Sequence, residues 1–141
     1  MDSKTLATKA LFTFIDAFNS MEKDRIINQL HFPHATHSDG LDPIIYTDPD
    51  QFWTALQPQL VRMKKFESWS YSTLDQHDII HVAPQTVQFM VTFSRRHADH
   101  QAYGTAKGLW IVTCKHQHWR LQMRSMFPAS GTISALAGQS G

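Results

Sequence analysis

The residues best suited to acid–base chemistry gather between positions 31 and 39. Three histidines, His31, His34 and His37, precede Asp39. A carboxylate that folding buries can act as a general base near neutral pH, because desolvation penalises its charged form. In an extended chain His37 lies on the same side as Asp39, where its imidazole could exchange protons or orient the carboxylate. The pair therefore predicts a catalytic site made of Asp39 and His37.

Both residues also have a structural interpretation. Asp39 precedes Gly40, and an Asp-Gly pair is a strong turn signal. In that case the carboxylate serves the turn and His37 is an exposed or hydrogen-bonded structural histidine. The sequence leaves the two interpretations open.

No metal or other cofactor is expected. Pro33 excludes a continuous helix, and an extended chain sends His34 to the side opposite His31 and His37. The three histidines therefore do not converge as metal ligands. The single cysteine, Cys114, has no neighbouring base in the sequence and is not expected to act as a nucleophile.

Aromatic side chains form a second group of interest, since they make up 11% of the chain. Most must belong to the core, because burying a large ring stabilises a small fold strongly. Some could line a cavity for a flat apolar molecule, and the tyrosine hydroxyls could orient it. The predicted ligand-binding residues are Phe14, Tyr46, Trp53, Tyr103 and Trp110.

Charge and composition limit the classes of partner. The chain has 141 residues, with 13 Lys and Arg against 12 Asp and Glu, and no basic run. Nucleic acid is therefore not an expected partner. No stretch approaches the roughly 20 apolar residues that span a bilayer, and the first residues do not resemble a secretion leader. We expect a cytoplasmic protein without membrane contact, with one domain over residues 1–128 and a flexible tail over 129–141.

The first half of the sequence predicts the helices that would position these residues. Apolar residues at one-turn spacing predict a helix over about residues 5–19, followed by a shorter one that ends before Pro33. Residues 34–46 should form two short extended segments around the Asp39-Gly40 turn. Asp48 and Pro49 predict the start of a third helix. Pro58 lies inside it and should kink or split it.

The second half predicts strands. Alternating residues indicate strands over residues 69–82, with a bend or bulge near 75–78, and over 87–94, 103–115 and 119–127. Arg124 alternates with Met123 and Ser125, so it faces solvent, a dimer partner or an inward acid. Helices followed by an antiparallel meander indicate an α+β fold, a cone-shaped roll in which N-terminal helices pack on a strongly curved, mainly antiparallel sheet.

Over residues 5–127 this arrangement resembles the nuclear transport factor 2-like superfamily, which includes ketosteroid isomerases and SnoaL-like polyketide cyclases. The segments that carry the resemblance are Ala17-Phe18-Asn19 with the following Glu22, Phe32-Pro33-His34-Ala35, Asp48-Pro49 and Trp119-Arg120-Leu121. The resemblance implies an α+β barrel around an apolar cavity, commonly in homodimers. It implies no single chemistry, because members include enzymes and pure binding modules.

The ketosteroid isomerase branch implies particular roles. Asp39 falls at the position of its base, and its two oxyanion donors correspond approximately to Phe14 and Trp110. Phe14 has no proton to donate, so only the indole N–H of Trp110 is left. Loss of one donor costs ~3 kcal/mol of transition-state stabilisation. A standard steroid isomerase is therefore not expected.

Three functions stay open. The first is a SnoaL-like pocket protein that binds a small apolar molecule and has no assigned chemistry. The second is an isomerase, cyclase or dehydratase that acts on a small carbonyl compound with Asp39 as base. The third is a non-catalytic dimerisation module that pairs through a mixed polar sheet face, formed by Gln88, Met90, Thr92, Gln122 and Arg124.

Overall fold

The computed structural model describes residues 1–127 and 130–131. Its helices are α1 (Ser3–Ser20), α2 (Lys23–Ile27) and α3 (Pro49–Arg62), and α3 continues into a π-helical turn, η1 (Met63–Glu67). Its strands are β1 (Leu30–Ser38), β2 (Ile44–Tyr46), β3 (Tyr71–Val82), β4 (Thr86–Arg96), β5 (Ala102–Lys115), β6 (His118–Met126) and β7 (Ser130–Gly131). Strand β7 pairs with β5 inside the segment predicted to be a tail. Residues 128–129 and 132–141, with the predicted domain boundary, lie outside the described residues.

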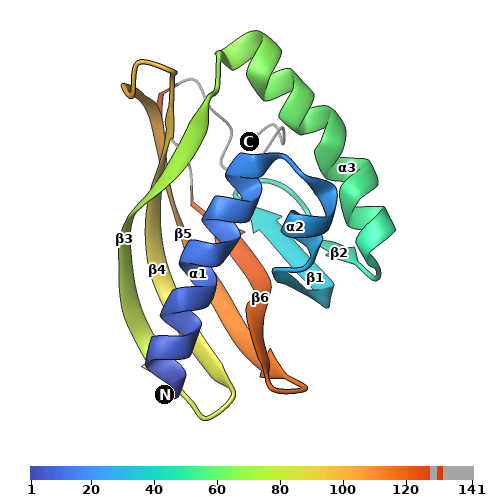
Figure 1. Ribbon diagram of the computed structural model, residues 1–141, viewed down its shortest axis with the longest axis vertical. Coiled ribbons are helices and arrows are strands. Elements are labelled where there is room, and N and C mark those ends of the chain that lie inside the picture. The colour runs from blue at the N-terminus through green and yellow to red at the C-terminus, as the bar shows by residue number, and fades with distance from the viewer. Residues whose placement is uncertain (128–129, 132–141) are drawn as a thin grey trace.

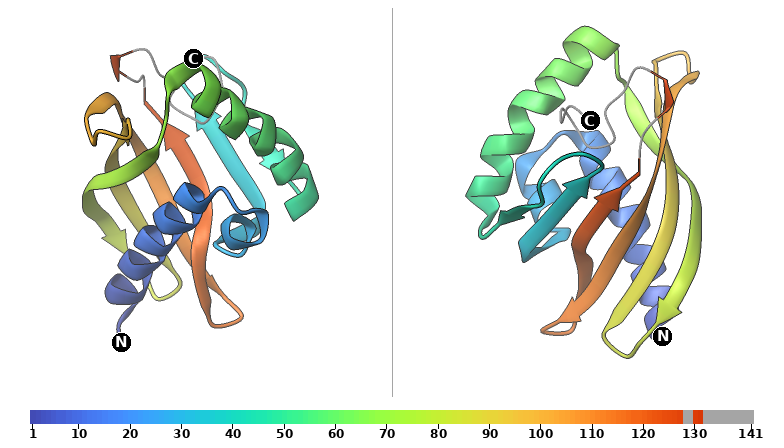
Figure 2. Two further views of the ribbon diagram at one scale, coloured as in Figure 1. Left: turned by 45° about the horizontal axis from the view of Figure 1, so that its top comes forward. Right: turned by 180° about the vertical axis from the view of Figure 1, so that it is seen from behind.

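The strands form one curved sheet in the order β2-β1-β6-β5-β4-β3, with β7 off this path (Figure 1). Strands β1 and β6 run parallel, and the other pairs are antiparallel. The predicted α+β class with helices on a mainly antiparallel curved sheet is confirmed. The barrel that the resemblance implied is wrong, because β2 and β3 stand at opposite edges of the described sheet and do not pair (Figure 2).

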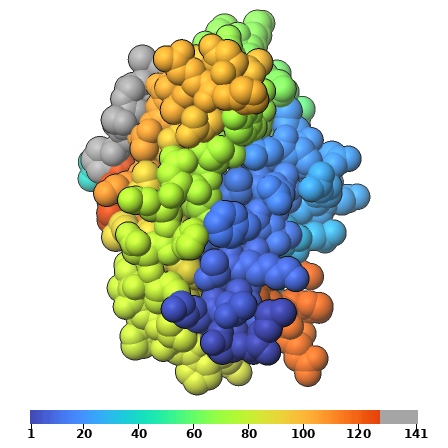
Figure 3. Space-filling model, turned by 60° about the vertical axis from the view of Figure 1, so that its left-hand side comes forward, coloured from blue at the N-terminus to red at the C-terminus, as the bar shows by residue number. Residues whose placement is uncertain are grey.

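Helix α1 packs on the concave side of the sheet. The Asp2 carboxylate caps its first turn by accepting from the Thr5 N–H, and Met21 ends it in a left-handed conformation. Its apolar stripe, as the periodicity predicted, is buried and includes Leu11 and Phe14. Figure 3 shows α1 (blue) packed along β3. The buried side chains of α1 therefore form the core together with the inward-facing side chains of the sheet.

Helix α3 begins as the sequence predicted. The Asp48 carboxylate accepts from the Gln51 N–H at 2.9 Å, and the Gln51 side chain accepts in return from the Thr47 N–H at 2.8 Å. Pro58 does not split the helix, which is continuous from Pro49 to Arg62. Since proline has no N–H, the Thr54 carbonyl lacks its usual helical donor. The helix lies across from β1 and β2, away from α1 (Figure 1).

A one-residue bulge in β6 decides which side chains face the concave side. Leu121 lies opposite Val112 and Met123 opposite Ile111, so no residue of β5 is paired opposite Gln122 in the ladder. The Gln122 side chain accepts from the Thr113 hydroxyl at 2.9 Å and donates to the Pro33 carbonyl. Such an extra residue reverses the inward and outward alternation that follows it. Beyond the bulge, Met123 is therefore exposed and Arg124 faces inward, toward the rings of Phe14 and Trp110.

No helix within the described residues is long and apolar enough to cross a membrane.

Candidate ligand-binding cavity

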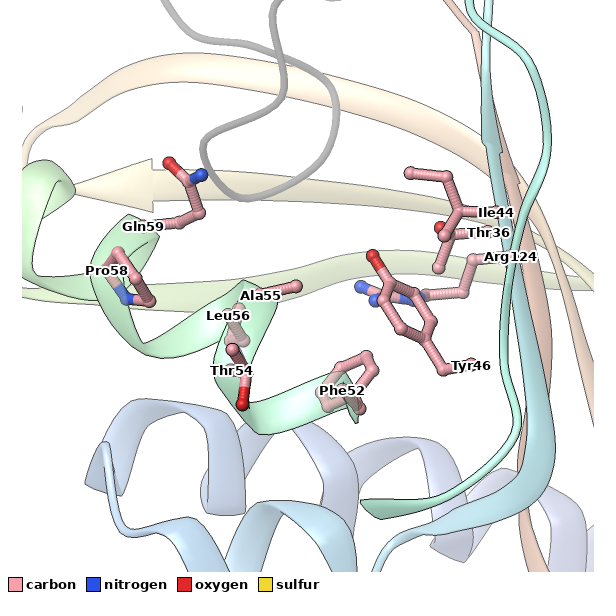
Figure 4. A pocket seen from close by; sticks show the side chains of 10 residues that line it. All are labelled: Thr36, Ile44, Tyr46, Phe52, Thr54, Ala55, Leu56, Pro58, Gln59 and Arg124. Atoms are coloured by element: carbon pink, nitrogen blue, oxygen red, sulfur yellow. The ribbon is translucent and has the colours of Figure 1, made fainter. Parts of the chain in front are cut away.

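A cavity of about 350 Å³ lies between α3 and the β1–β2–β6 end of the sheet (Figure 4). Its size is at the lower end of the roughly 300–1,000 Å³ range of small-molecule pockets. Most of its wall is apolar, with a few polar groups. The lining residues are Thr36, Ile44, Tyr46, Phe52, Thr54, Ala55, Leu56, Pro58, Gln59 and Arg124.

Strand pairing places the sheet side of this cavity in one cross-strand row. Thr36 of β1 lies opposite both Ile44 of β2 and Arg124 of β6, and Arg124 lies opposite Trp110 of β5. Residues paired across strands project from the same face of a sheet. The row therefore brings Arg124 to the boundary between the open cavity and the solid core.

The guanidinium of Arg124 rests on aromatic rings. Its carbon lies 5.5 Å from the centre of the Phe14 ring and 5.7 Å from that of Trp110, within the range of cation–π attraction. It makes no hydrogen bond or ion pair with another described residue, and its Nε is buried without a partner. Burial lowers the pKa of Arg124 to about 10, and the neighbouring Tyr46 partly opposes this shift. Arg124 is therefore a cation at neutral pH.

Two further polar atoms of the lining residues are buried without a hydrogen-bond partner among residues 1–127. They are Oγ1 of Thr36 and Oε1 of Gln59. Buried polar atoms in folded proteins nearly always have a partner. In Figure 4, Thr36, Tyr46 and Arg124 lie at one end of the cavity and Gln59 lies at the other. The cavity thus has unused hydrogen-bonding groups at both ends.

His34 is fully buried behind this wall, with its ring 5.5 Å from that of Phe52. Neither ring nitrogen has a hydrogen-bond partner within the described part of the chain. Burial is the main cause that lowers the pKa of His34 to about 3, and the charge of Arg124 adds to it. The Leu121 backbone opposes the shift weakly. His34 is therefore neutral at physiological pH.

The predicted catalytic residues do not line the cavity. Asp39 is exposed in the turn after β1, and His37 is half-buried on the convex face, its Nδ1 3.1 Å from the Ser125 hydroxyl. The cause is the alternation of β1, which turns Thr36 and Ser38 inward and His37 outward. The desolvation that a buried base requires is absent at Asp39. A catalytic role for Asp39 and His37 stays a prediction.

The five aromatic residues predicted to bind a ligand fall into different places. Tyr46 lines the cavity, while Phe14 and Trp110 lie in the core under Arg124. The indole N–H of Trp110 donates to the Met126 sulfur at 3.1 Å, so it is already engaged. Trp53, half-buried against the core, does not line this cavity.

Tyr103 belongs to a separate polar cluster beside η1. Its hydroxyl donates to the Glu67 carboxylate at 2.7 Å, and its ring stacks on His97 at 4.3 Å. Burial, followed by the contact with Glu67, raises the pKa of Tyr103. Glu67 also accepts from Arg95 at 3.2 Å. The groups of this cluster are paired with one another and stabilise the fold there.

The sequence did not identify Thr36 or Gln59 as site residues, and it left the direction of Arg124 open. The structure turns Arg124 inward, toward rings instead of an acid. The available signal was an arginine in a predicted strand of the sheet, flanked by Met123 on one side and followed by Met126. Within the described residues, no group of three or more His, Cys, Asp or Glu is arranged to hold a metal ion.

Neither a protein-family model nor a curated protein sequence matches the chain. Solved structures share its architecture at low identity. A protein of unknown function with a cystatin-like fold from Nostoc punctiforme has a TM-score of 0.70 and 10% identity, covering 96% of this chain and 100% of that one. A nuclear transport factor 2-like protein from Cytophaga hutchinsonii has a TM-score of 0.66 and 11% identity, covering 90% and 98%.

A ketosteroid isomerase-like protein from Erwinia carotovora atroseptica has a TM-score of 0.63 and 10% identity, covering 91% of this chain and 96% of its own. Identities at this level show the fold alone. The chain therefore has the nuclear transport factor 2-like fold, in agreement with the resemblance found in its sequence. Its chemistry has to be argued from its own cavity.

Proposed function

We propose that this protein binds a small, largely apolar molecule in the cavity between α3 and strands β1, β2 and β6. One observation carries the proposal: the cavity combines apolar walls with three buried polar atoms, on Thr36, Gln59 and Arg124, that have no partner in the described part of the chain. An unsatisfied buried polar group costs about 1–3 kcal/mol. A ligand that hydrogen-bonds to these groups would recover part of that free energy.

The lining favours binding over acid–base catalysis. Among the described lining residues, the titratable side chains are Tyr46 and Arg124. Neither a phenol nor a guanidinium is a general base near neutral pH. The carboxylate of the enzyme hypothesis, Asp39, lies outside the cavity.

The proposal is tested by filling the cavity. Ala55 lines it, while Gln57 lies on the same helix, is exposed and does not line it. In a screen of small aromatic and aliphatic compounds, we expect hits that raise the melting temperature of the wild type and of Gln57→Trp but not of Ala55→Trp. Hits should also shift the backbone NMR resonances of Thr36 and Tyr46. Binding that is equally tight in Ala55→Trp would contradict the proposal.

We also propose that two copies pair through the convex face of the sheet. On this face the exposed side chains of Ile45 and Met123 lie on either side of Ala35 in one cross-strand row. Arg124, predicted to belong to this surface, faces the cavity instead, because of the bulge at Gln122. Sedimentation equilibrium should show a dimer that Met123→Glu weakens and Ile80→Glu, at another exposed position, does not. A wild type that is monomeric at high concentration would refute the pairing.

A further inference from the structure

We propose that the ligand of this cavity is a monocarboxylate, an aromatic or aliphatic acid whose carboxylate pairs with Arg124 and whose apolar body lies against α3. This inference rests on the proposed function, since it names the chemical class of molecule that the same cavity takes. It is argued from the charge balance of the cavity, from the geometry of its cation and from the position of its remaining polar groups.

The absence of a carboxylate partner distinguishes Arg124 from Arg95 and Arg96, the two arginines that strand β4 contributes. The Arg95 side chain is 3% exposed and pairs with Glu67 at 3.2 Å, and Arg96 pairs with Asp75 at 3.7 Å. Arg124 has no carboxylate partner among the described residues, and its guanidinium lies over the rings of Phe14 and Trp110. Cation–π contacts offset only part of the cost of desolvating a charge. The anion that would pair with Arg124 is therefore supplied by the ligand.

One negative charge balances the site. Arg124 is the one charged side chain among the described lining residues. A monoanion neutralises it, a dianion leaves a net negative charge in an apolar cavity, and a neutral ligand leaves the cation unpaired. The planar guanidinium also matches a carboxylate with two parallel hydrogen bonds. A carboxylate therefore fits this end better than a phosphate monoester.

The other polar groups orient the same molecule. The hydroxyls of Thr36 and Tyr46 lie at the Arg124 end of the cavity, where they can donate to carboxylate oxygens (Figure 4). The Gln59 amide lies at the opposite end, where its Oε1 can accept from a hydroxyl or N–H on the far side of the ligand. Phe52 and Leu56 supply the apolar wall between the two ends.

The test compares acids with their neutral isosteres on the wild-type protein. Phenylacetate, 4-phenylbutyrate and decanoate are titrated at pH 7 beside the corresponding amides, and phenyl phosphate is added as a dianion. We expect at least one acid to bind about 10- to 100-fold more tightly than its amide, the range for a hydrogen bond to a charged group. We also expect phenyl phosphate to bind more weakly than phenylacetate.

Three outcomes have distinct meanings. Amides that bind as tightly as acids, with shifts at Thr36 and Tyr46, would overturn the monocarboxylate inference and leave the proposed function standing. Tighter binding of phenyl phosphate would also overturn it. No binding by either member of any pair at millimolar concentration would contradict both proposals.

Variants locate the selectivity. Arg124→Met should lose the preference for acid over amide, with the acid weakened about 10- to 100-fold. Arg124→Lys keeps the positive charge but lacks the planar guanidinium. Its preference for acid over amide should therefore lie between those of Arg124→Met and the wild type. Arg62→Gln, which removes an exposed arginine of α3, should change neither affinity. An unchanged ratio in a folded Arg124→Met protein would refute the role of Arg124, and the wild-type acid-to-amide ratio remains decisive if that variant does not fold.

Discussion

At the scale of single residues, the partner that the fold supplies decides what an arginine does. Arg95 and Arg124 have the same chemistry, and both lie largely inside the protein. Arg95 is held by Glu67, so it serves the structure. Arg124 lies over two aromatic rings, so its N–H groups stay available to hydrogen-bond a ligand. Function and stability therefore compete at Arg124.

This competition makes a prediction about stability. Arg124→Met should raise the free energy of unfolding of the ligand-free protein by about 1–2 kcal/mol, because the desolvation cost of an unpaired charge exceeds its cation–π attraction. Arg95→Met should lower it by several kcal/mol, because Glu67 is left unpaired. Urea unfolding at pH 7 measures both changes. Loss of stability in Arg124→Met would show that the rings compensate the charge fully.

A second residue-scale prediction concerns acid sensitivity. The pKa of His34 falls from 6.5 to about 3 on folding, so between these values the unfolded state binds more protons. The free energy of unfolding is therefore not reduced by His34 above pH 6.5. As the pH falls from 6.5 toward 3, protonation of His34 in the unfolded state lowers the free energy of unfolding by about 1.4 kcal/mol per pH unit.

His34→Phe should flatten this part of the stability profile, because phenylalanine keeps the ring and cannot take up the proton. His81→Gln removes an exposed histidine and should leave the profile unchanged. Urea midpoints at pH 7 and pH 4.5 distinguish the two. If the urea midpoint of His34→Phe falls between pH 7 and pH 4.5 as much as that of the wild type, a residue other than His34 causes the loss of stability.

At the scale of elements, the close approach of β5 and β6 positions the site. Gly108 of β5 pairs with Met126 of β6, two positions along each strand from the pair formed by Trp110 and Arg124. A Cβ added at Gly108 would lie 2.8 Å from the Ser125 carbonyl oxygen and 2.5 Å from the Met126 sulfur. The backbone oxygen cannot move without shifting β6. The absence of a side chain at Gly108 thus supports the geometry of the cavity wall.

We therefore expect Gly108→Ala to destabilise the protein by about 1–3 kcal/mol, the usual cost of overpacking. Gly40→Ala is the matched change, because Gly40 has open space around it and is strained only by its φ of 80°. That change should cost about 1 kcal/mol and leave the NMR resonances of β6 unmoved. Equal effects of the two substitutions on β6 would contradict this account.

At the scale of the whole molecule, the hollow of the cone is divided in two. Helix α1 packs against β6, β3, β4 and β5, and buried rings such as Phe14 and Phe89 fill the space there. Helix α3 stands across from β1 and β2, and the cavity lies between them. Ligand binding should therefore stabilise the elements around the cavity, β2 and α3, more than β4.

Amide hydrogen exchange measures the stabilisation of each region separately. A bound ligand should slow amide exchange in residues 44–62, which include β2 and α3, because it joins two elements across an open cavity. Exchange in β4 should be unchanged, since its residues already pack in the core. Equal slowing in both regions would indicate global stabilisation without binding at this cavity.

Much of the fold could be predicted from the sequence because its signals are local. The stripe of α1, the Asp48 cap and the alternation of β4 depend on neighbouring residues alone. The same holds for the Asp39-Gly40 turn. The site could not be predicted in the same way, since Thr36, Gln59 and Arg124 come from three elements whose meeting depends on strand register.

The sequence by itself determined the order of elements, the α+β class and the resemblance to nuclear transport factor 2-like proteins. Only the tertiary structure decided that Gln122 forms a bulge, that Arg124 therefore turns inward, and that no acid of the described chain meets it there. The physical reason is that side chains alternate along a strand, so one unpaired residue exchanges the two faces for every residue after it. The pairing partner that creates such a bulge lies on another strand.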